Sequence, residues 1–145
     1  MPVDPYVDEG YFLKLKELDN AVQSNAADIV LMGITPTYPS AKYGYIIPGG
    51  EGELRKDSLR KKPDKQTAET LVAEGALWNN GVLAVKLSHL IKLLNSRTAC
   101  KSYIDVIEQY SLLEKTDSIA VVSYSGEWHD LGTWNTLTEV MDEKP

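Results

Sequence analysis

The spacing of apolar residues along the chain predicts that helices and strands alternate. After Asp8, which we expect to be an N-cap, apolar residues recur three or four positions apart over residues 8–25 and predict a helix. Its buried face is expected to carry Phe12, Leu15, Leu18 and Val22. Continuous apolar runs at residues 28–34 and 118–124 are instead typical of strands that are buried on both faces.

Shorter apolar segments predict the remaining elements. A loop with two prolines precedes a strand at residues 43–48, and residues 49–57 supply a turn and a more polar hairpin arm. Residues 76–87 predict a strand that is interrupted by a turn at residues 79–81. Further helices are expected at residues 65–75, 88–96, 100–113 and 134–143.

These elements predict a single α/β domain over residues 1–145, with three αβα layers and a mixed, mostly parallel sheet. A chain of 145 residues is long enough to bury a core without disulfides, and its one cysteine excludes an internal disulfide. One cysteine and two histidines also cannot furnish a closed zinc site. The single-domain prediction therefore depends on apolar burial alone.

The net charge, the lack of a long apolar run and the N-terminal residues limit the classes of partner and the cellular location that we expect. A net charge of −6 argues against nonspecific binding to nucleic acid or to an anionic membrane surface. No apolar run approaches the roughly 20 residues that span a bilayer. The acidic N-terminus has no apolar segment of the kind that a secretory signal requires. We therefore expect a cytoplasmic protein that does not bind nucleic acid or membranes through its overall charge.

A basic segment interrupts this acidic chain. Residues 55–65 hold six of the fifteen lysines and arginines and only two acids. Lys62 is the best candidate for an anion ligand, because Pro63 fixes the local backbone and restricts the residue before it to extended geometry. The alternative is a solvated loop or a lysine-protected sheet edge, and the charge pattern alone favours that alternative.

Two other stretches allow a ligand contact beside a structural role. Trp78 could pack beneath a sugar ring or fill the core, and the core is the usual place for an aromatic residue in a strand. Asn79 and Asn80 could form a turn before Gly81, although an amide also suits sugar hydroxyls because it both donates and accepts. Gly44, between two tyrosines, indicates either a bulge or a close approach to the backbone.

Two isolated acids, Asp4 and Asp130, each lie just beyond an apolar segment and beside a turn. Asp130 is also flanked by Trp128 and Trp134. Two carboxylates that converge at strand ends would offer Mg²⁺ the oxygen ligands that it prefers. The alternative for each, taken alone, is an aspartate that caps a turn.

Five stretches, taken in order, resemble successive motifs of the sugar-1-phosphate nucleotidyltransferases, and most closely those of the mannose-1-phosphate guanylyltransferases. They read MPVDPYV, GITPTYPSAKYGYI, KKPD, GALWNNGVLAV and WHDLGTW. The resemblance implies a nucleotide-diphospho-sugar transferase fold, which is Rossmann-like, and a reaction in which GTP and mannose 1-phosphate give GDP-mannose and pyrophosphate with Mg²⁺.

The resemblance also implies roles for individual residues. Asp4 and Asp130 match the two metal-binding aspartates, so that Asp130 and the phosphate-binding Lys62 are the expected catalytic residues. Asn79 matches the asparagine that holds sugar hydroxyls. Tyr43 and Gly44 belong to the motif that contacts the sugar, Gly44 through its backbone. A metal ligand therefore explains Asp130 better than a turn cap does.

The chain departs from this pattern in two ways. Lys61 stands where the family usually has a glutamate that grips sugar hydroxyls, and a cation cannot accept those hydrogen bonds. No glycine-rich nucleotide loop occurs in the sequence. We therefore expect the sugar-phosphate-binding part of a catalytic domain, inactive alone, which meets GTP only with a preceding part and which could form a homodimer. The alternative is a non-catalytic binding or regulatory module that pairs with a complete enzyme.

Overall fold

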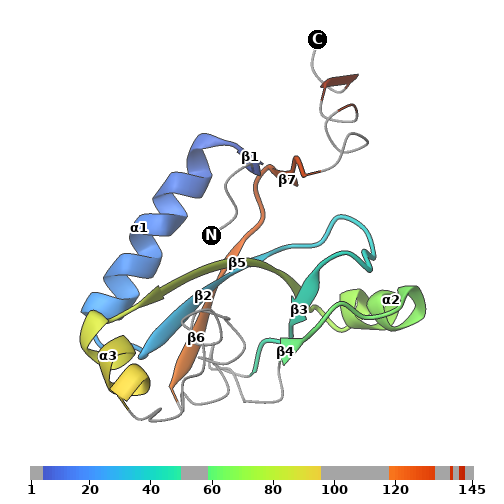
Figure 1. Cartoon of the computed structure of the whole chain (residues 1–145). Helices are drawn as coiled ribbons and strands as arrows, with labels where there is room; N and C mark the ends of the chain where they lie inside the picture. The colour runs from blue at the N-terminus through green and yellow to red at the C-terminus, as the bar shows by residue number, and fades with distance from the viewer. Residues whose placement is uncertain (1–4, 50–58, 96–117, 133–137, 139–140, 143–145) are drawn as a thin grey trace.

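The computed structural model describes residues 5–49, 59–95, 118–132, 138 and 141–142 (Figure 1). The helices predicted at residues 100–113 and 134–143, and Asp4, lie wholly or mostly outside the described residues. The described elements are β1 (Pro5–Val7), α1 (Glu9–Gln23), β2 (Ile29–Ile34), β3 (Gly44–Ile46), β4 (Leu59–Arg60), α2 (Lys65–Ala73), β5 (Leu77–Val85), α3 (Leu87–Asn95), β6 (Ile119–Tyr124) and β7 (Trp128–Asp130).

Five strands form a sheet in the order β4-β3-β5-β2-β6, so the predicted mixed α/β fold is confirmed. The prediction that this sheet is mostly parallel is wrong for the described strands. Only β2 and β6 pair in parallel, whereas β5 is antiparallel to both β2 and β3, and β3 is antiparallel to β4. Helix α2 does connect two strands of the same direction, β4 and β5. These strands are not neighbours, however, because β3 lies between them and runs in the opposite direction.

Side chains from alternate positions of β2 build two cores, one on each face of the sheet. All six residues of β2 are buried, as the continuous apolar run predicts. Val30 and Met32 pack in one cluster with residues of α1 and α2, whereas Ile29 and Leu31 pack in another that Leu90 of α3 joins. Figure 1 shows α1 and α2 at opposite ends of the sheet. The described helices thus contribute to both faces, as a three-layer fold requires.

Helix α1 begins after Asp8, as predicted, but the prediction that Phe12 belongs to its buried face is wrong. Leu18 and Val22 are buried, whereas the side chain of Phe12 is 58% exposed. Tyr11 takes the core position instead, and its ring packs edge-on against Tyr124 at a centroid distance of 5.7 Å. Asp8 occupies the N-cap position, but its side chain makes no hydrogen bond to the helix.

The turn that was predicted within residues 76–87 is absent, because β5 continues from Leu77 to Val85. Of the predicted turn residues only Gly81 has a positive φ, of 78°. The local irregularity is a shift of register opposite Leu31 and Gly33 of β2. Because neighbours on both sides pair with β5, the two asparagines stay in a strand. By contrast, α2 has the predicted stop, since Gly75 follows it with a φ of 82°.

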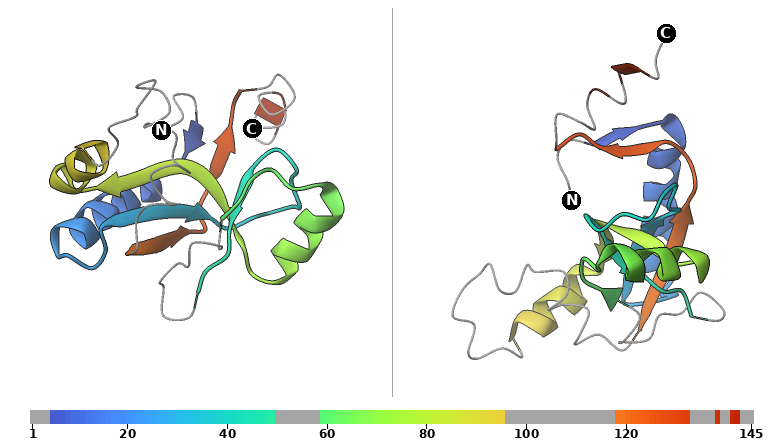
Figure 2. Two further views of the ribbon diagram at one scale, coloured as in Figure 1. Left: turned by 60° about the horizontal axis from the view of Figure 1, so that its bottom comes forward. Right: turned by 90° about the vertical axis from the view of Figure 1, so that its right-hand side faces the viewer.

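The two described strands outside this sheet, β1 and β7, pair antiparallel in a separate two-stranded ribbon. Figure 2 shows this ribbon beside the five-stranded sheet and not within it. Its three facing pairs are Pro5 with Asp130, Tyr6 with His129 and Val7 with Trp128. Among the described residues, no helix is both long and apolar enough to span a bilayer.

Candidate functional site

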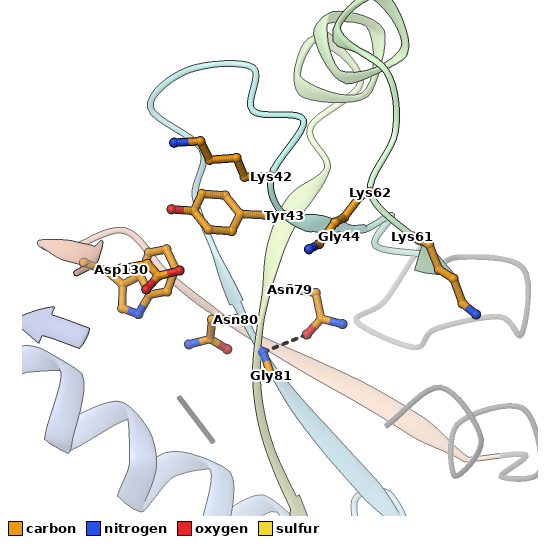
Figure 3. Close-up of a pocket in the computed structure, with 10 residues that line it drawn as sticks. Lys42, Tyr43, Gly44, Lys61, Lys62, Asn79, Asn80, Gly81 and Asp130 are labelled. Carbon is orange, nitrogen blue, oxygen red and sulfur yellow. Dashed lines mark hydrogen bonds between the residues drawn. The ribbon is translucent and has the colours of Figure 1, made fainter. Parts of the chain in front are cut away.

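An open pocket of about 500 Å³ brings together segments that are far apart in the sequence (Figure 3). They are the start of β3 with the loop before it, the segment after β4, the middle of β5, and β7. The lining residues are Lys42, Tyr43, Gly44, Lys61, Lys62, Asn79, Asn80, Gly81, Trp128 and Asp130. All of the site residues predicted from the sequence that the structure describes are among them, whereas Asp4 lies outside the described residues.

Strand register places two of these residues directly opposite each other. Asn79 of β5 faces Gly44 of β3 on one side and Gly33 of β2 on the other. A Cβ atom at Gly33 would lie 2.6 Å from a methyl carbon of Leu77, so no larger residue fits there without a shift. Gly44 pairs with Asn79 without a break in register, which argues against the bulge interpretation. Its exposed backbone lies at the pocket.

The two neighbouring asparagines are held in different ways. Asn79 is partly exposed, and its Oδ1 accepts a hydrogen bond from the Gly81 N–H at 3.1 Å (Figure 3). Asn80 is buried, and its Oδ1 accepts from the Val82 N–H at 3.1 Å. These local bonds fix the orientation of both amides. Asn79 is the one whose amide is accessible to a polar ligand.

Aromatic rings support one side of the pocket. Tyr43 packs against Trp78 and Trp128 at centroid distances of 4.9 and 5.4 Å. Trp78 is buried beneath this layer and donates from Nε1 to the Tyr45 hydroxyl at 3.2 Å, so the core interpretation of Trp78 is confirmed. Trp128 lines the pocket itself, whereas the sequence interpretation gave it only the role of holding Asp130. Its spacing from Asp130 could have indicated this position, because residues two apart in a strand point to the same face, and Trp128 lies two residues before Asp130.

The rim of the pocket carries more positive than negative charge. Lys42, Lys61 and Lys62 line it together with a single carboxylate, that of Asp130. In Figure 3 the ammonium group of Lys62 points towards the space between Gly44 and Asn79, whereas that of Lys61 points away. In a chain of net charge −6 this concentration of cations is local. The geometry therefore favours an anion site at Lys62 over a solvated sheet edge.

Asp130 is held by the turn that follows it. Its Oδ1 accepts a hydrogen bond from the Gly132 N–H at 3.0 Å, so the turn predicted at this point exists. Within the described part of the chain, Oδ2 has no hydrogen-bond partner. A free carboxylate oxygen at a pocket suits a hard cation such as Mg²⁺, which keeps several waters and needs only one or two carboxylates.

The described residues contain no cluster of three or more histidine, cysteine or acidic side chains. A divalent ion at this pocket would therefore depend on few protein ligands and on oxygens that a substrate supplies. Asp4, the other predicted ligand, directly precedes Pro5 in the sequence, and Pro5 pairs with Asp130 across the ribbon. Among the described residues, the pocket thus offers a hard cation such as Mg²⁺ one carboxylate, that of Asp130.

Comparisons with known proteins identify the family of the chain. A model of the nucleotidyl transferase family matches residues 8–144. The mannose-1-phosphate guanylyltransferase of Salmonella montevideo is 28% identical over 94% of this chain. The xanthan biosynthesis protein XanB of Xanthomonas campestris pv. campestris is 28% identical over 85% of it.

A solved structure is also similar. It is described as the mannose-1-phosphate geranyltransferase of Thermus thermophilus, and it matches the whole of this chain with a TM-score of 0.74 and 28% identity. The chain spans 49% of that protein, 36% of the Salmonella protein and 32% of the Xanthomonas protein. The similarity therefore concerns one part of each relative.

Proposed function

The chain belongs to the nucleotidyl transferase family, and we propose that it forms the sugar-phosphate-binding part of an enzyme that makes GDP-mannose from GTP and mannose 1-phosphate. One observation carries the proposal. Tyr43, Gly44, Lys62, Asn79 and Asp130 come from four separate segments and line one pocket. The relatives named for mannose 1-phosphate support that choice of sugar.

The polar groups of the pocket divide the recognition of a sugar phosphate between them. The ammonium group of Lys62 binds the phosphate as a point charge. The exposed amide of Asn79 and the backbone beside Gly44 hydrogen-bond sugar hydroxyls, since an amide offers both a donor and an acceptor. Tyr43, which rests on Trp78 and Trp128, gives one side of the sugar an apolar contact.

Asp130, with Asp4 as the second carboxylate, is the proposed holder of Mg²⁺. The ion, when bound, supplies neutralisation of the negative charge on phosphate oxygens. The protein contributes position and fixed charge, and little acid–base chemistry is needed for an attack by one phosphate oxygen on another phosphorus. Lys62 and Asp130 are on this account the two residues that contact reacting phosphates.

Calorimetric titration with mannose 1-phosphate and Mg²⁺ tests the proposal. We expect Lys62→Ala to weaken binding about tenfold or more, because a charge-assisted hydrogen bond to the phosphate is lost. Lys16→Ala is the matched control, since Lys16 is exposed on α1 and does not line the pocket. Equal affinity of Lys62→Ala and the unchanged chain would contradict the proposed phosphate site.

A second candidate function is a non-catalytic module that binds sugar phosphates and pairs with a complete enzyme. Lys61 favours it, because this cation lines the pocket at the position where the family resemblance leads one to expect a sugar-gripping glutamate. Measurement of pyrophosphate release from GTP and mannose 1-phosphate separates the two. Because the chain alone is expected to be inactive, the assay uses the chain joined to the preceding, nucleotide-binding part of a relative. Turnover that then depends on Asp130 supports the enzyme, and binding without turnover supports the module. Inactivity of the chain alone, a cytoplasmic location and a homodimer stay predictions.

A further inference from the structure

A cluster of polar contacts joins the start of α1 to the connection between β6 and β7. We call it the Asp8 clasp, and it consists of Asp8, Tyr124, Gly126 and Glu127. The Tyr124 hydroxyl donates to Asp8 Oδ1, and the Glu127 N–H donates to Asp8 Oδ2 at 3.0 Å. The Asp8 N–H donates in return to the Glu127 carbonyl at 3.3 Å. The carboxylate that the sequence places as a helix cap thus holds a distant segment.

The protonation states of the clasp make its central hydrogen bond a charge-assisted one. The hydrogen bond from Tyr124, and then that from the Glu127 N–H, lowers the pKa of Asp8 below its ordinary value. Burial, and then the hydrogen bond and charge of Asp8, raises the pKa of Tyr124. At neutral pH a neutral phenol therefore donates to a carboxylate anion, which is among the stronger kinds of protein hydrogen bond.

Glycine is required where the chain passes the clasp. A Cβ atom at Gly126 would lie 2.2 Å from the Tyr124 hydroxyl oxygen and 2.7 Å from Asp8 Oδ2. On the other side, a Cβ atom at Gly10 would lie 3.1 Å from Asp8 Oδ1. Any side chain at position 126 must therefore push Tyr124 and Asp8 apart. The glycines at positions 10 and 126 thus leave room for the hydrogen bonds of the Asp8 carboxylate.

The clasp closes the ribbon that carries Asp130. The ribbon has three facing pairs, and a two-stranded ribbon of this length is marginally stable by itself. The pair of Pro5 with Asp130, which matters for the pocket, is the last of the three pairs and lies farthest from the clasp. At the other end of the ribbon Val7 faces Trp128. The next residues of the two strands at that end are Asp8, which follows Val7, and Glu127, which precedes Trp128. The clasp and the burial of Trp128 thus hold the ribbon at this end.

We propose that the Asp8 clasp is a positioning device for metal binding, which holds the carboxylate of Asp130 at the pocket by fixing the ribbon of β1 and β7. Asp8 and Tyr124 contact no ligand on this account and act only through Asp130. The inference rests on the proposed function, because it takes Asp130 to be a ligand of the divalent ion.

Titration of the chain with Mn²⁺, followed by the electron paramagnetic resonance of the free ion, tests the clasp without any turnover. We expect Tyr124→Phe to weaken Mn²⁺ binding about tenfold, the size of effect seen when groups that orient a metal ligand are lost. Asp8→Asn, which keeps the shape of the side chain, should weaken it in the same direction. Circular dichroism establishes that each variant is folded.

Tyr11→Phe is the matched control. The rings of Tyr11 and Tyr124 are in contact, and the buried Tyr11 hydroxyl lies beside the Asn80 side chain but makes no hydrogen bond to the described residues of the clasp. Its loss should leave Mn²⁺ affinity unchanged. Affinity for mannose 1-phosphate without metal gives a second readout. Tyr124→Phe should change it less than it changes Mn²⁺ affinity, because Lys62 and Asn79 do not lie on the ribbon, although Tyr43 packs against Trp128 of β7. A merely structural role would weaken both affinities together.

The variant Asp130→Asn separates failure of the inference from failure of the proposed function. If Asp130→Asn weakens Mn²⁺ binding and Tyr124→Phe does not, the clasp does not position the ligand, and the proposed function stands. If Asp130→Asn leaves Mn²⁺ binding unchanged, the proposed metal site itself is wrong. Weaker binding in both, with Tyr11→Phe unchanged, supports the clasp.

Discussion

The five-stranded sheet and the ribbon of β1 and β7 supply the same pocket, but they differ in how firmly they hold their residues. Gly44 and Asn79 lie on strands with neighbours on both sides, above side chains that are fully buried. Asp130 lies at the end of a ribbon with three facing pairs. The difference indicates that the sugar contacts are set by paired strands of the sheet, whereas the metal ligand depends on a short ribbon that Trp128 and the clasp attach to the core.

The largest effect is expected from a cavity in the sheet. Leu31 is fully buried in β2, and Leu31→Ala should lower the free energy of unfolding by about 3 kcal/mol, because transfer and cavity terms add. Urea unfolding followed by tryptophan fluorescence measures it. Leu13→Ala is the control, since Leu13 is 66% exposed and its loss should change stability by less than about 0.5 kcal/mol. Similar effects of the two substitutions would mean that β2 does not hold the fold together.

A smaller and more local effect is expected from crowding the clasp. Gly126→Ala should lower the free energy of local opening of the ribbon by about 2 kcal/mol, because the added methyl group overlaps Tyr124 and Asp8. Hydrogen exchange of the Asp8 and Glu127 amides measures it. The amide of Leu31 in β2 serves as the internal control and should keep its protection. Equal loss of protection in β2 and the ribbon would show that the two regions open as one unit.

The smallest effect is a dependence on pH that belongs to the ribbon alone. The pKa of Asp8 is lower in the folded protein than its ordinary value of 3.8, so its carboxylate stabilises the fold above that pH. This contribution is lost as the pH falls through the folded pKa. The difference in Glu127 amide protection between the unchanged chain and Asp8→Asn should therefore be largest near neutrality and shrink in acid. A difference that is constant with pH would contradict the charged clasp.

The sequence predicts the regular parts of the sheet region well and the ribbon poorly. The strand at residues 29–34 follows from its continuous apolar run, and Gly75 ends α2 because glycine adopts a positive φ readily. The ribbon strands are three residues long, too short for any periodicity to appear. Asn79 was misread as a turn residue, because its pairing with Gly33 and Gly44 outweighs its local preference, whereas Asn80 and Gly81 lie where the register shifts.

The pocket was predictable only in part. Composition and spacing left each candidate residue with a structural alternative, and it was the family resemblance that put Lys62, Asn79 and Asp130 at one site. The structure places the three residues around one pocket, and strand register, which a single sequence does not specify, sets Asn79 opposite Gly44. The clasp could not be predicted from the sequence, because Asp8 lies more than a hundred residues from Tyr124 and Glu127 and no local pattern marks their contact.

The central claim is that one pocket holds a sugar phosphate at Lys62 and a divalent ion at Asp130. A crystal structure of the chain with mannose 1-phosphate and Mn²⁺, with the ion located by its anomalous scattering, tests it most directly. The account predicts a single Mn²⁺ peak in contact with the Asp130 carboxylate and a phosphate within reach of the Lys62 ammonium group. Ion and phosphate bound on separate faces, or an ion away from Asp130, would contradict it.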